Sequence, residues 1–198
     1  MGKVIAVVGN SGAGKTTLVR ALCQHAVFAC GMEQHAGRPF QALFKNEPRY
    51  ALANQVDYLL SRATQERDLR QTTADILIDG GLDLDFHGFT RLFHARGFLD
   101  ESEFNLCRDL YTFLRSILPP PELIIHMVVD RQIISKRLMK RERINIATPE
   151  DLDLLDAFIR EWLATLDPGK VLSVDTTTDN VQFTRTVPLL LEKINRLR

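Results

Sequence analysis

The sequence lacks an excess of charge of either sign, because its 25 Lys and Arg residues are balanced by 25 Asp and Glu residues. No overall electrostatic field therefore draws the protein to nucleic acid or to an anionic membrane, and we expect neither as a partner. Any binding site for an anion must be local.

Long hydrophobic runs are also missing. The apolar run that begins at Val4 is interrupted at Gly9, too soon for the core of a signal peptide or for a transmembrane helix. We therefore expect a cytoplasmic protein. The 198 residues, of which 45% are hydrophobic, contain no repeat and no linker-like stretch, so we expect one domain spanning residues 1–198.

Cysteine is scarce. Cys23, Cys30 and Cys107 are odd in number and do not have the paired spacing of a zinc site. We expect three reduced thiols that pack as small hydrophobic side chains.

What the chain does contain is an alternation of short apolar runs and longer segments of helical character. The runs are typical of buried parallel strands and cover residues 4–8, 27–30, 76–78, 123–129 and 171–174, the second being the weakest. Helices are expected at residues 15–25, 49–71, 101–117, 131–141, 149–166 and 181–197. This alternation predicts an α/β fold.

The first apolar run leads into GNSGAGKTTL, which matches GxxxxGKT between a strand and a helix. Glycines let consecutive backbone N–H groups wrap around a phosphate. The alternative is an ordinary Gly-rich turn in which the lysine has no functional role. Lys15 would reach the β and γ phosphates, and the Thr16 hydroxyl would bind Mg²⁺. We predict that ATP is held by Gly9, Asn10, Ser11, Gly12, Ala13, Gly14, Lys15, Thr16 and Thr17.

The rest of the chain narrows the class of P-loop protein. It contains no NKxD motif of a GTPase, and the strand at 76–79 ends in one acid, Asp79, rather than the pair expected in an ATP-driven motor. Arg137, Arg141 and Arg143 recur about four residues apart at a predicted helix end. Beside a P-loop, they favour a kinase lid at about 137–148 over a solvated basic surface.

In this order the motifs resemble those of the deoxynucleoside kinase family. Besides the P-loop and the lid arginines, the chain has Glu33 after the second strand, EPRYA at 47–51, QVDYLLSR at 55–62 and LIDGG at 77–81. The resemblance implies a five-stranded parallel sheet with helices on both faces, an arginine-bearing lid, a small-molecule phosphate acceptor and a homodimer formed through long helices.

The resemblance also implies roles for single residues. Glu33 and Asp79 would lie near the nucleophile and the Mg²⁺ ion, Gln55 would pair with a nucleobase edge, and Arg62 and Asp85 would line the base pocket. Asp79, at the carboxyl end of a strand beside the P-loop, stands where a general base is expected. The predicted catalytic residues are thus Lys15, Glu33, Asp79, Arg137 and Arg141, with Thr16, Glu33 and Asp79 at the metal and Arg141 and Arg143 on ATP.

Three positions depart from the family pattern on the side of the acceptor sugar. Gly80 and Gly81 replace Arg and Ser after the catalytic acid. Phe44 stands where the family has a Tyr that contacts the sugar, and we predict that Phe44 lines the substrate pocket. A Glu beyond the lid arginines is replaced by Asn145 and Ile146. A pocket without these hydrogen-bonding groups should discriminate poorly for deoxyribose, so the acceptor could be an unusual nucleoside or another hydroxylated molecule.

Histidines could replace the lost donors. His35, His87 and His94 all fall near the predicted pocket, and His87, close to Asp79 and Asp85, is the first candidate for substrate binding.

Two other functions remain open. A nucleoside monophosphate kinase would need cations for the acceptor phosphate, which Arg38, Arg62 and Arg91 could supply. A regulator that binds ATP without catalysis would explain Gly80 and Gly81.

Overall fold

The computed structural model describes residues 2–32, 38–140 and 148–196. Its centre is a sheet of five parallel strands in the order β2-β3-β1-β4-β5. The strands are β1 (Val4–Gly9), β2 (Ala29–Gly31), β3 (Ile76–Asp79), β4 (Leu123–Val128) and β5 (Val171–Asp175). The predicted five-stranded parallel α/β fold is confirmed.

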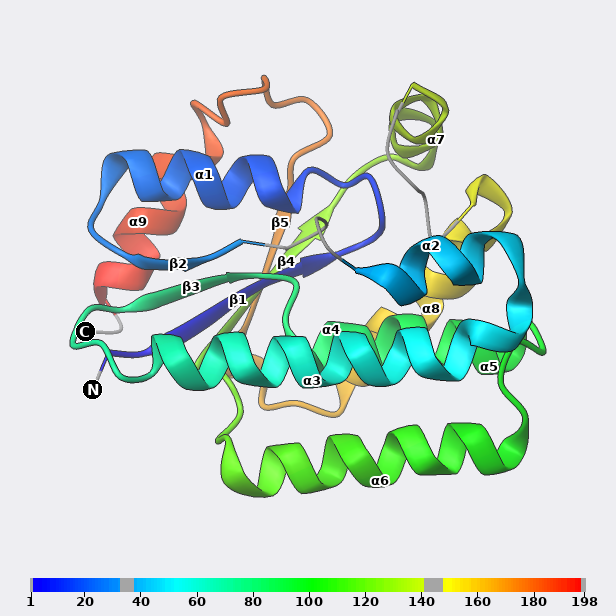
Figure 1. The fold of residues 1–198 in the computed structure, drawn as a ribbon. Coiled ribbons are helices and arrows are strands. Elements are labelled where there is room, and N and C mark those ends of the chain that lie inside the picture. The colour runs from blue at the N-terminus through cyan, green and yellow to red at the C-terminus, as the bar shows by residue number, and fades with distance from the viewer. Residues whose placement is uncertain (1, 33–37, 141–147, 197–198) are drawn as a thin grey trace.

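Helices cover both faces of the sheet (Figure 1). α1 (Lys15–His25) and α9 (Thr186–Arg196) lie on one face, and α3 (Ala51–Leu69) and α8 (Leu152–Ala164) lie on the other, with α6 (Glu101–Ile117) packed outside α3. Alternate residues of β1 explain why its apolar run is continuous. Ile5 and Val7 pack with the α1 and α9 side chains, whereas Ala6 and Val8 pack with those of α8.

The start of α6 is set by local hydrogen bonds. α6 begins where a capping box forms: the Asp100 carboxylate accepts from the Glu103 backbone N–H at 2.8 Å, and the Glu103 carboxylate accepts from that of Asp100 at 2.9 Å. Other helical elements are α7 (Arg131–Met139) and the short turns η1 (Pro48–Tyr50), η3 (Pro149–Asp151) and η4 (Pro168–Lys170).

Two helical regions were not predicted. α2 (Pro39–Asn46) is short, and residues 82–95 form an unbroken series of α4 (Leu82–Leu84), the π-helical turn η2 (Asp85–Thr90) and α5 (Arg91–Ala95). The helical character of residues 82–95 is hard to recognise in the sequence because Gly88 lies within it. Its place is set by tertiary packing, because a Cβ there would lie 3.1 Å from Leu155 on α8.

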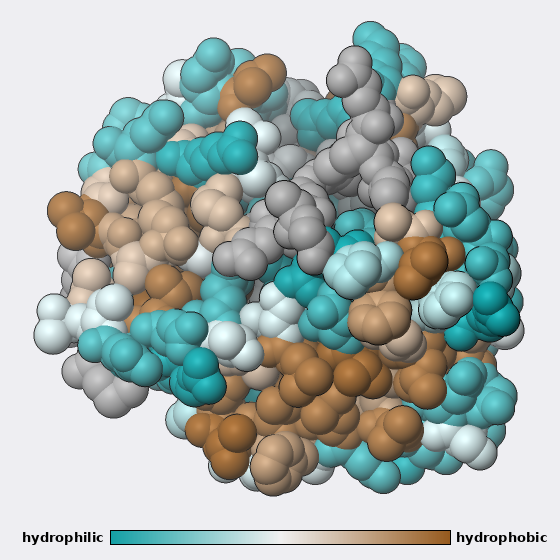
Figure 2. Space-filling model, in the orientation of Figure 1, coloured by the Kyte–Doolittle hydropathy of each residue, from teal (hydrophilic) through white to brown (hydrophobic). Residues whose placement is uncertain are grey.

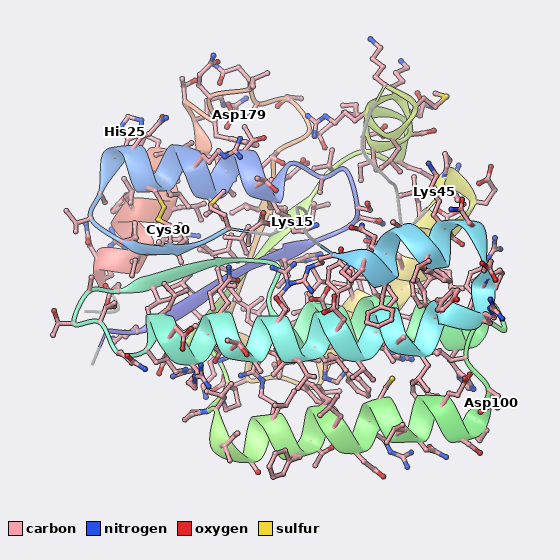
Figure 3. All side chains as sticks on the ribbon, in the orientation of Figure 1. Lys15, His25, Cys30, Lys45, Asp100 and Asp179 are labelled. Carbon is pink, nitrogen blue, oxygen red and sulfur yellow. A yellow bond between two sulfur atoms is a disulfide. The ribbon has the colours of Figure 1, made fainter. Side chains whose placement is uncertain are left out.

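The prediction of three free thiols is wrong for one pair. Cys23 of α1 and Cys30 of β2 form a disulfide (Figure 3). The chain reverses between α1 and β2 and brings the two cysteines together, which their count and spacing cannot reveal. Cys107 is a free, fully buried cysteine, as predicted, and burial raises its pKa to about 11.

No helix in the described parts of the chain has the length and apolar character needed to cross a membrane.

Candidate active site

The P-loop connects β1 to α1 in the geometry that phosphate binding requires. Gly12 and Gly14 have φ values of +81° and +104°, in the left-handed region that favours glycine. No side chain caps α1. Its first N–H groups, which lack partners within the helix, therefore form an anion-binding end. The P-loop residues that border the cleft are Ser11, Gly12, Gly14, Lys15, Thr16 and Thr17.

The other three predicted P-loop residues do not line the cleft and instead hold the loop in place. Asn10 donates from Nδ2 to the Leu152 carbonyl of α8 at 2.8 Å, and its Oδ1 accepts from the Ser11 N–H at 2.8 Å. Gly9 lies so close to β4 that a Cβ would be 2.8 Å from the Met127 carbonyl oxygen. Ala13 is fully buried.

Two cations lie against the loop. Lys15, labelled in Figure 3 at the first turn of α1, donates from Nζ to the carbonyls of Gly9 and Asn10, both at 3.0 Å. Arg137 of α7 donates to the Ala13 carbonyl at 2.9 Å and also borders the cleft. The loop therefore carries positive charge on the side where a polyphosphate would lie.

Asp79 ends β3 beside the P-loop, because parallel pairing with β1 sets it opposite Val7. The side chain is buried, and its Oδ2 accepts from the Thr16 hydroxyl at 2.5 Å. Its Oδ1 is buried and makes no hydrogen bond with the described residues. A carboxylate oxygen without a partner, next to a hydroxyl, matches the hard oxygen ligands that Mg²⁺ prefers.

Part of the predicted site cannot be located. Glu33, Arg141 and Arg143 lie outside the described residues, as do His35, Asn145 and Ile146. Within the described ranges, no three His, Cys, Asp or Glu side chains gather as a metal-binding group. A Mg²⁺ ion at Thr16 and Asp79 would thus take further ligands from phosphate oxygens and water, which is its usual preference.

Three of the predicted acceptor residues, Gln55, Arg62 and Asp85, border the same cleft, which has a volume of about 480 Å³. Arg62 of α3 donates from Nε to Asp85 Oδ2 at 2.7 Å, and both side chains are buried. Gln55 donates from Nε2 to the Asp85 carbonyl at 3.1 Å and to the Thr90 hydroxyl at 2.7 Å. The structure thus brings Gln55, Arg62 and Asp85 together, with the carbonyl oxygen of Gln55 left to accept a further hydrogen bond.

The backbone conformation explains why glycine stands at positions 80 and 81. Their φ values are +81° and +92°, so the chain leaves β3 through a left-handed turn that Arg and Ser would strain. A Cβ at Gly80 would lie 3.5 Å from Nη2 of Arg62. The guanidinium of Arg62 therefore lies near the position from which the family's arginine would extend.

Phe44, which we predicted to bind substrate, does not border the cleft. Its ring packs against Phe93 at 4.8 Å and Phe98 at 5.5 Å between centroids. Without a hydroxyl, Phe44 gains more from this aromatic cluster than from a polar cleft.

His87, which we also predicted to bind substrate, packs with aromatic side chains instead of bordering the cleft. Its ring stacks on Trp162 at 5.1 Å, and its Nε2 lies 3.1 Å from the Tyr111 hydroxyl. It therefore belongs to an aromatic cluster behind the cleft and does not border it. His94 also lies away from the cleft, stacked on Phe104.

His87 makes stability depend on pH. Burial lowers its pKa from 6.5 to about 4, against the opposing attraction of Asp83. Between these values the unfolded chain binds a proton that the folded protein does not, so the free energy of unfolding falls as pH falls from 6.5 towards 4. We expect His87→Phe to lose less stability over this range than the wild type, measured by urea unfolding. His25→Phe, at an exposed histidine, should retain the wild-type slope; an equal slope in both variants would contradict the assignment.

Part of the cleft lining comes from residues that no motif in the sequence points to. Further lining residues are Arg20 of α1, Gln41 of α2, Tyr58 of α3, Leu84, Phe89, and Asn180, Val181 and Phe183 before α9. Helical spacing could have found two of them, because Arg20 lies four residues after Thr16 and Tyr58 lies three after Gln55. The others come from segments that only the tertiary fold brings together.

The arginines considered for a second phosphate are engaged elsewhere. Arg38 donates to Asp57 on α3 at 2.7 Å, and Arg91 pairs with Glu161 at 2.6 Å; neither borders the cleft. Of the three, the cleft retains Arg62, which pairs with Asp85. These contacts do not favour an acceptor that carries a phosphate.

The chain is similar to known proteins in sequence. The family model described as deoxynucleoside kinase matches residues 5–197. The deoxyadenosine kinase of Dictyostelium discoideum is 28% identical over 143 residues, which are 72% of this chain and 58% of that protein. The deoxyguanosine kinase of Bacillus subtilis (strain 168) is 27% identical over 142 residues, 70% of this chain and 67% of that protein. The match thus spans less than two thirds of the Dictyostelium relative.

A solved structure shares the fold. The deoxyadenosine kinase from M. mycoides with the products dCMP and a flexible dCDP bound superposes with a TM-score of 0.83 at 20% identity, over 98% of this chain and 99% of that chain. The same enzyme with bound dATP gives a TM-score of 0.78 over the same shares.

Proposed function

The chain belongs to the deoxynucleoside kinase family, and from this premise we propose that it is an ATP-dependent kinase that phosphorylates a hydroxyl of a deoxynucleoside or a similar small molecule. The observation that carries the proposal is that one cleft joins the P-loop to Gln55, Arg62 and Asp85. Asp79 lies at the P-loop, bonded to Thr16. This is the arrangement needed to bring a phosphate donor and a neutral acceptor together.

In this proposal, the P-loop amides and Lys15 bind the β and γ phosphates of ATP. Asp79 accepts the proton of the attacking hydroxyl, and Glu33 assists at the metal. Arg137, with Arg141 and Arg143 of the lid, stabilises charge on the transferring phosphoryl group. Gln55, Arg62 and Asp85 orient the acceptor. Thr16, Asp79 and Glu33 would hold Mg²⁺, which supplies charge neutralisation between the phosphates when bound.

An acceptor panel tests the proposal. The protein is incubated with Mg²⁺, ATP and one acceptor at a time, chosen from the common deoxynucleosides and their 5′-monophosphates, and products are identified by mass spectrometry. We expect one ADP for each deoxynucleoside monophosphate formed. Product from monophosphate acceptors alone would indicate a nucleoside monophosphate kinase. Tight ATP binding without turnover on any acceptor would indicate a non-catalytic regulator.

We also propose a cytoplasmic homodimer. Its support is a hydrophobic patch over α3 and α6, formed by Leu60, Leu106, Phe113 and Ile117, whose side chains are 47% to 62% exposed (Figure 2). The three α6 residues are spaced seven and four apart and so share one side of that helix. An exposed apolar stripe of this kind is typical of a protein interface.

The dimer can be tested by one substitution. We expect Phe113→Asp to shift the protein from dimer to monomer in light scattering after gel filtration, because a carboxylate would be buried in the interface. The control is Leu189→Asp, at a similarly exposed leucine of α9 outside the patch, which should remain dimeric. A monomeric wild type, or a dimeric Phe113→Asp, would exclude this interface.

A further inference from the structure

Gln41 is a buried polar side chain that the motifs do not point to. It is 6% exposed, and it borders the cleft that contains Gln55, Arg62 and Asp85. Its carboxamide makes no hydrogen bond with another described residue. Its amide atoms are not among the fully buried side-chain atoms that lack a partner, so they meet the solvent in the cleft. A ligand that enters the cleft can replace this water and bond to the amide.

Two contacts fix the orientation of α2 and hence of Gln41. At the start of the helix, Arg38 donates to Asp57 Oδ2 of α3 at 2.7 Å, and its guanidinium lies 4.6 Å from the centre of the Tyr58 ring. At the other end, Phe44 packs into the aromatic cluster with Phe93. Gln41 lies between these two anchors, so its place at the cleft does not depend on contacts of its own amide.

The neighbouring polar groups are already committed. Both donors of the Gln55 amide are used by the Asp85 carbonyl and the Thr90 hydroxyl, and Asp85 is paired with Arg62. Gln55 can therefore only accept from a ligand. Gln41 can both donate and accept, which a hydroxylated, neutral molecule would match.

We propose that Gln41 is a specificity-determining residue that hydrogen-bonds the phosphate acceptor. It supplies from α2 a polar contact that Phe44, on the same helix, does not make. This inference rests on the proposed kinase function, because it assumes that the acceptor occupies this end of the cleft. It assigns the contact to a neutral acceptor such as a nucleoside, since a carboxamide carries no charge to pair with a phosphate.

The test compares wild type, Gln41→Leu and Gln71→Leu, a control at an exposed glutamine of the same protein. With saturating MgATP, we expect Gln41→Leu to raise the acceptor KM about fivefold or more, the loss of one hydrogen bond, with the KM for ATP within twofold. The melting temperature of the unliganded variant should be nearly unchanged, because the Gln41 amide makes no hydrogen bond with another described residue. The control should match the wild type in the acceptor KM, the KM for ATP and the melting temperature.

An acceptor KM within twofold of wild type would overturn the inference, and so would a lower melting temperature without a change in KM. Failure of the proposed kinase function can be distinguished from failure of the inference about Gln41. If the wild type phosphorylates no acceptor, the melting-temperature rise caused by deoxyadenosine, deoxyguanosine or deoxycytidine is measured instead. A rise in wild type that is absent in Gln41→Leu supports the contact, whereas equal rises, or none in wild type, contradict it.

Discussion

Asp79→Asn is expected to lower kcat about 10²- to 10⁴-fold, the range typical for loss of a general acid or base. Asp79 is buried at the end of β3, where its Oδ2 accepts from Thr16 and its Oδ1 has no partner among the described residues. Asparagine keeps the shape and can still accept from Thr16, but it cannot take the proton of an attacking hydroxyl. Protein folding and the KM for the acceptor should therefore change little.

The matched control lies on the same strand segment. Asp75, just before β3, accepts from the Lys3 N–H at 3.0 Å at the opposite end of the strand. Asp75→Asn should retain nearly full kcat in the same steady-state assay. A kcat for Asp79→Asn within about tenfold of wild type would mean that another group takes the proton.

Arg115→Met is expected to destabilise the fold by about 3–5 kcal/mol, the cost of leaving buried charges unpaired. Arg115 of α6 donates to both carboxylate oxygens of Asp83 at 2.8 Å and to those of Glu66 at 3.0 and 3.1 Å. Burial alone would lower its pKa, but these two carboxylates outweigh burial and raise it. Without Arg115, Asp83 loses both ion-pair bonds, while Glu66 retains Arg70.

This prediction is checked by urea unfolding, with Arg108→Met as control. Arg108 lies on the same helix but is half exposed and pairs with Asp109 at 3.9 Å, so its loss should cost less than about 1 kcal/mol. Equal effects of the two substitutions would show that the buried network does not stabilise the protein. Because Asp83 follows the Gly80–Gly81 turn closely, a fall in activity that tracks the loss of stability is also expected.

The layers of the fold were predictable because each strand and long helix carries its own periodic signal. β1 reads as a continuous apolar run since both of its faces are buried, and α6 starts at a capping box visible in the sequence. α2 and residues 82–95 were not predictable in this way. α2 is short, and Gly88 looks like a helix breaker although its role is to allow close contact with Leu155.

Some residues of the candidate site could likewise be predicted from the sequence, and others could not. The P-loop, Asp79 and the Gln55–Arg62–Asp85 group depend on local motifs. The structure brings the P-loop and that group to one cleft, with Asp79 bonded to Thr16 of the P-loop. The family pattern predicts Phe44 at the substrate, and closeness to Asp79 and Asp85 in the sequence predicts His87 there. In the structure Phe44 packs with Phe93 and His87 with Trp162. The Cys23–Cys30 disulfide and the place of Gln41 depend on how α1, β2 and α2 sit in three dimensions. No pattern in one sequence encodes these.

Binding of MgATP to wild type and Lys15→Ala, measured by titration calorimetry, tests the central claim that the P-loop holds a nucleotide polyphosphate. The wild type should bind, and Lys15→Ala should bind about 10- to 100-fold more weakly, the loss of one charge-assisted hydrogen bond to phosphate. Equal affinities, with the same dependence on Mg²⁺, would contradict the account.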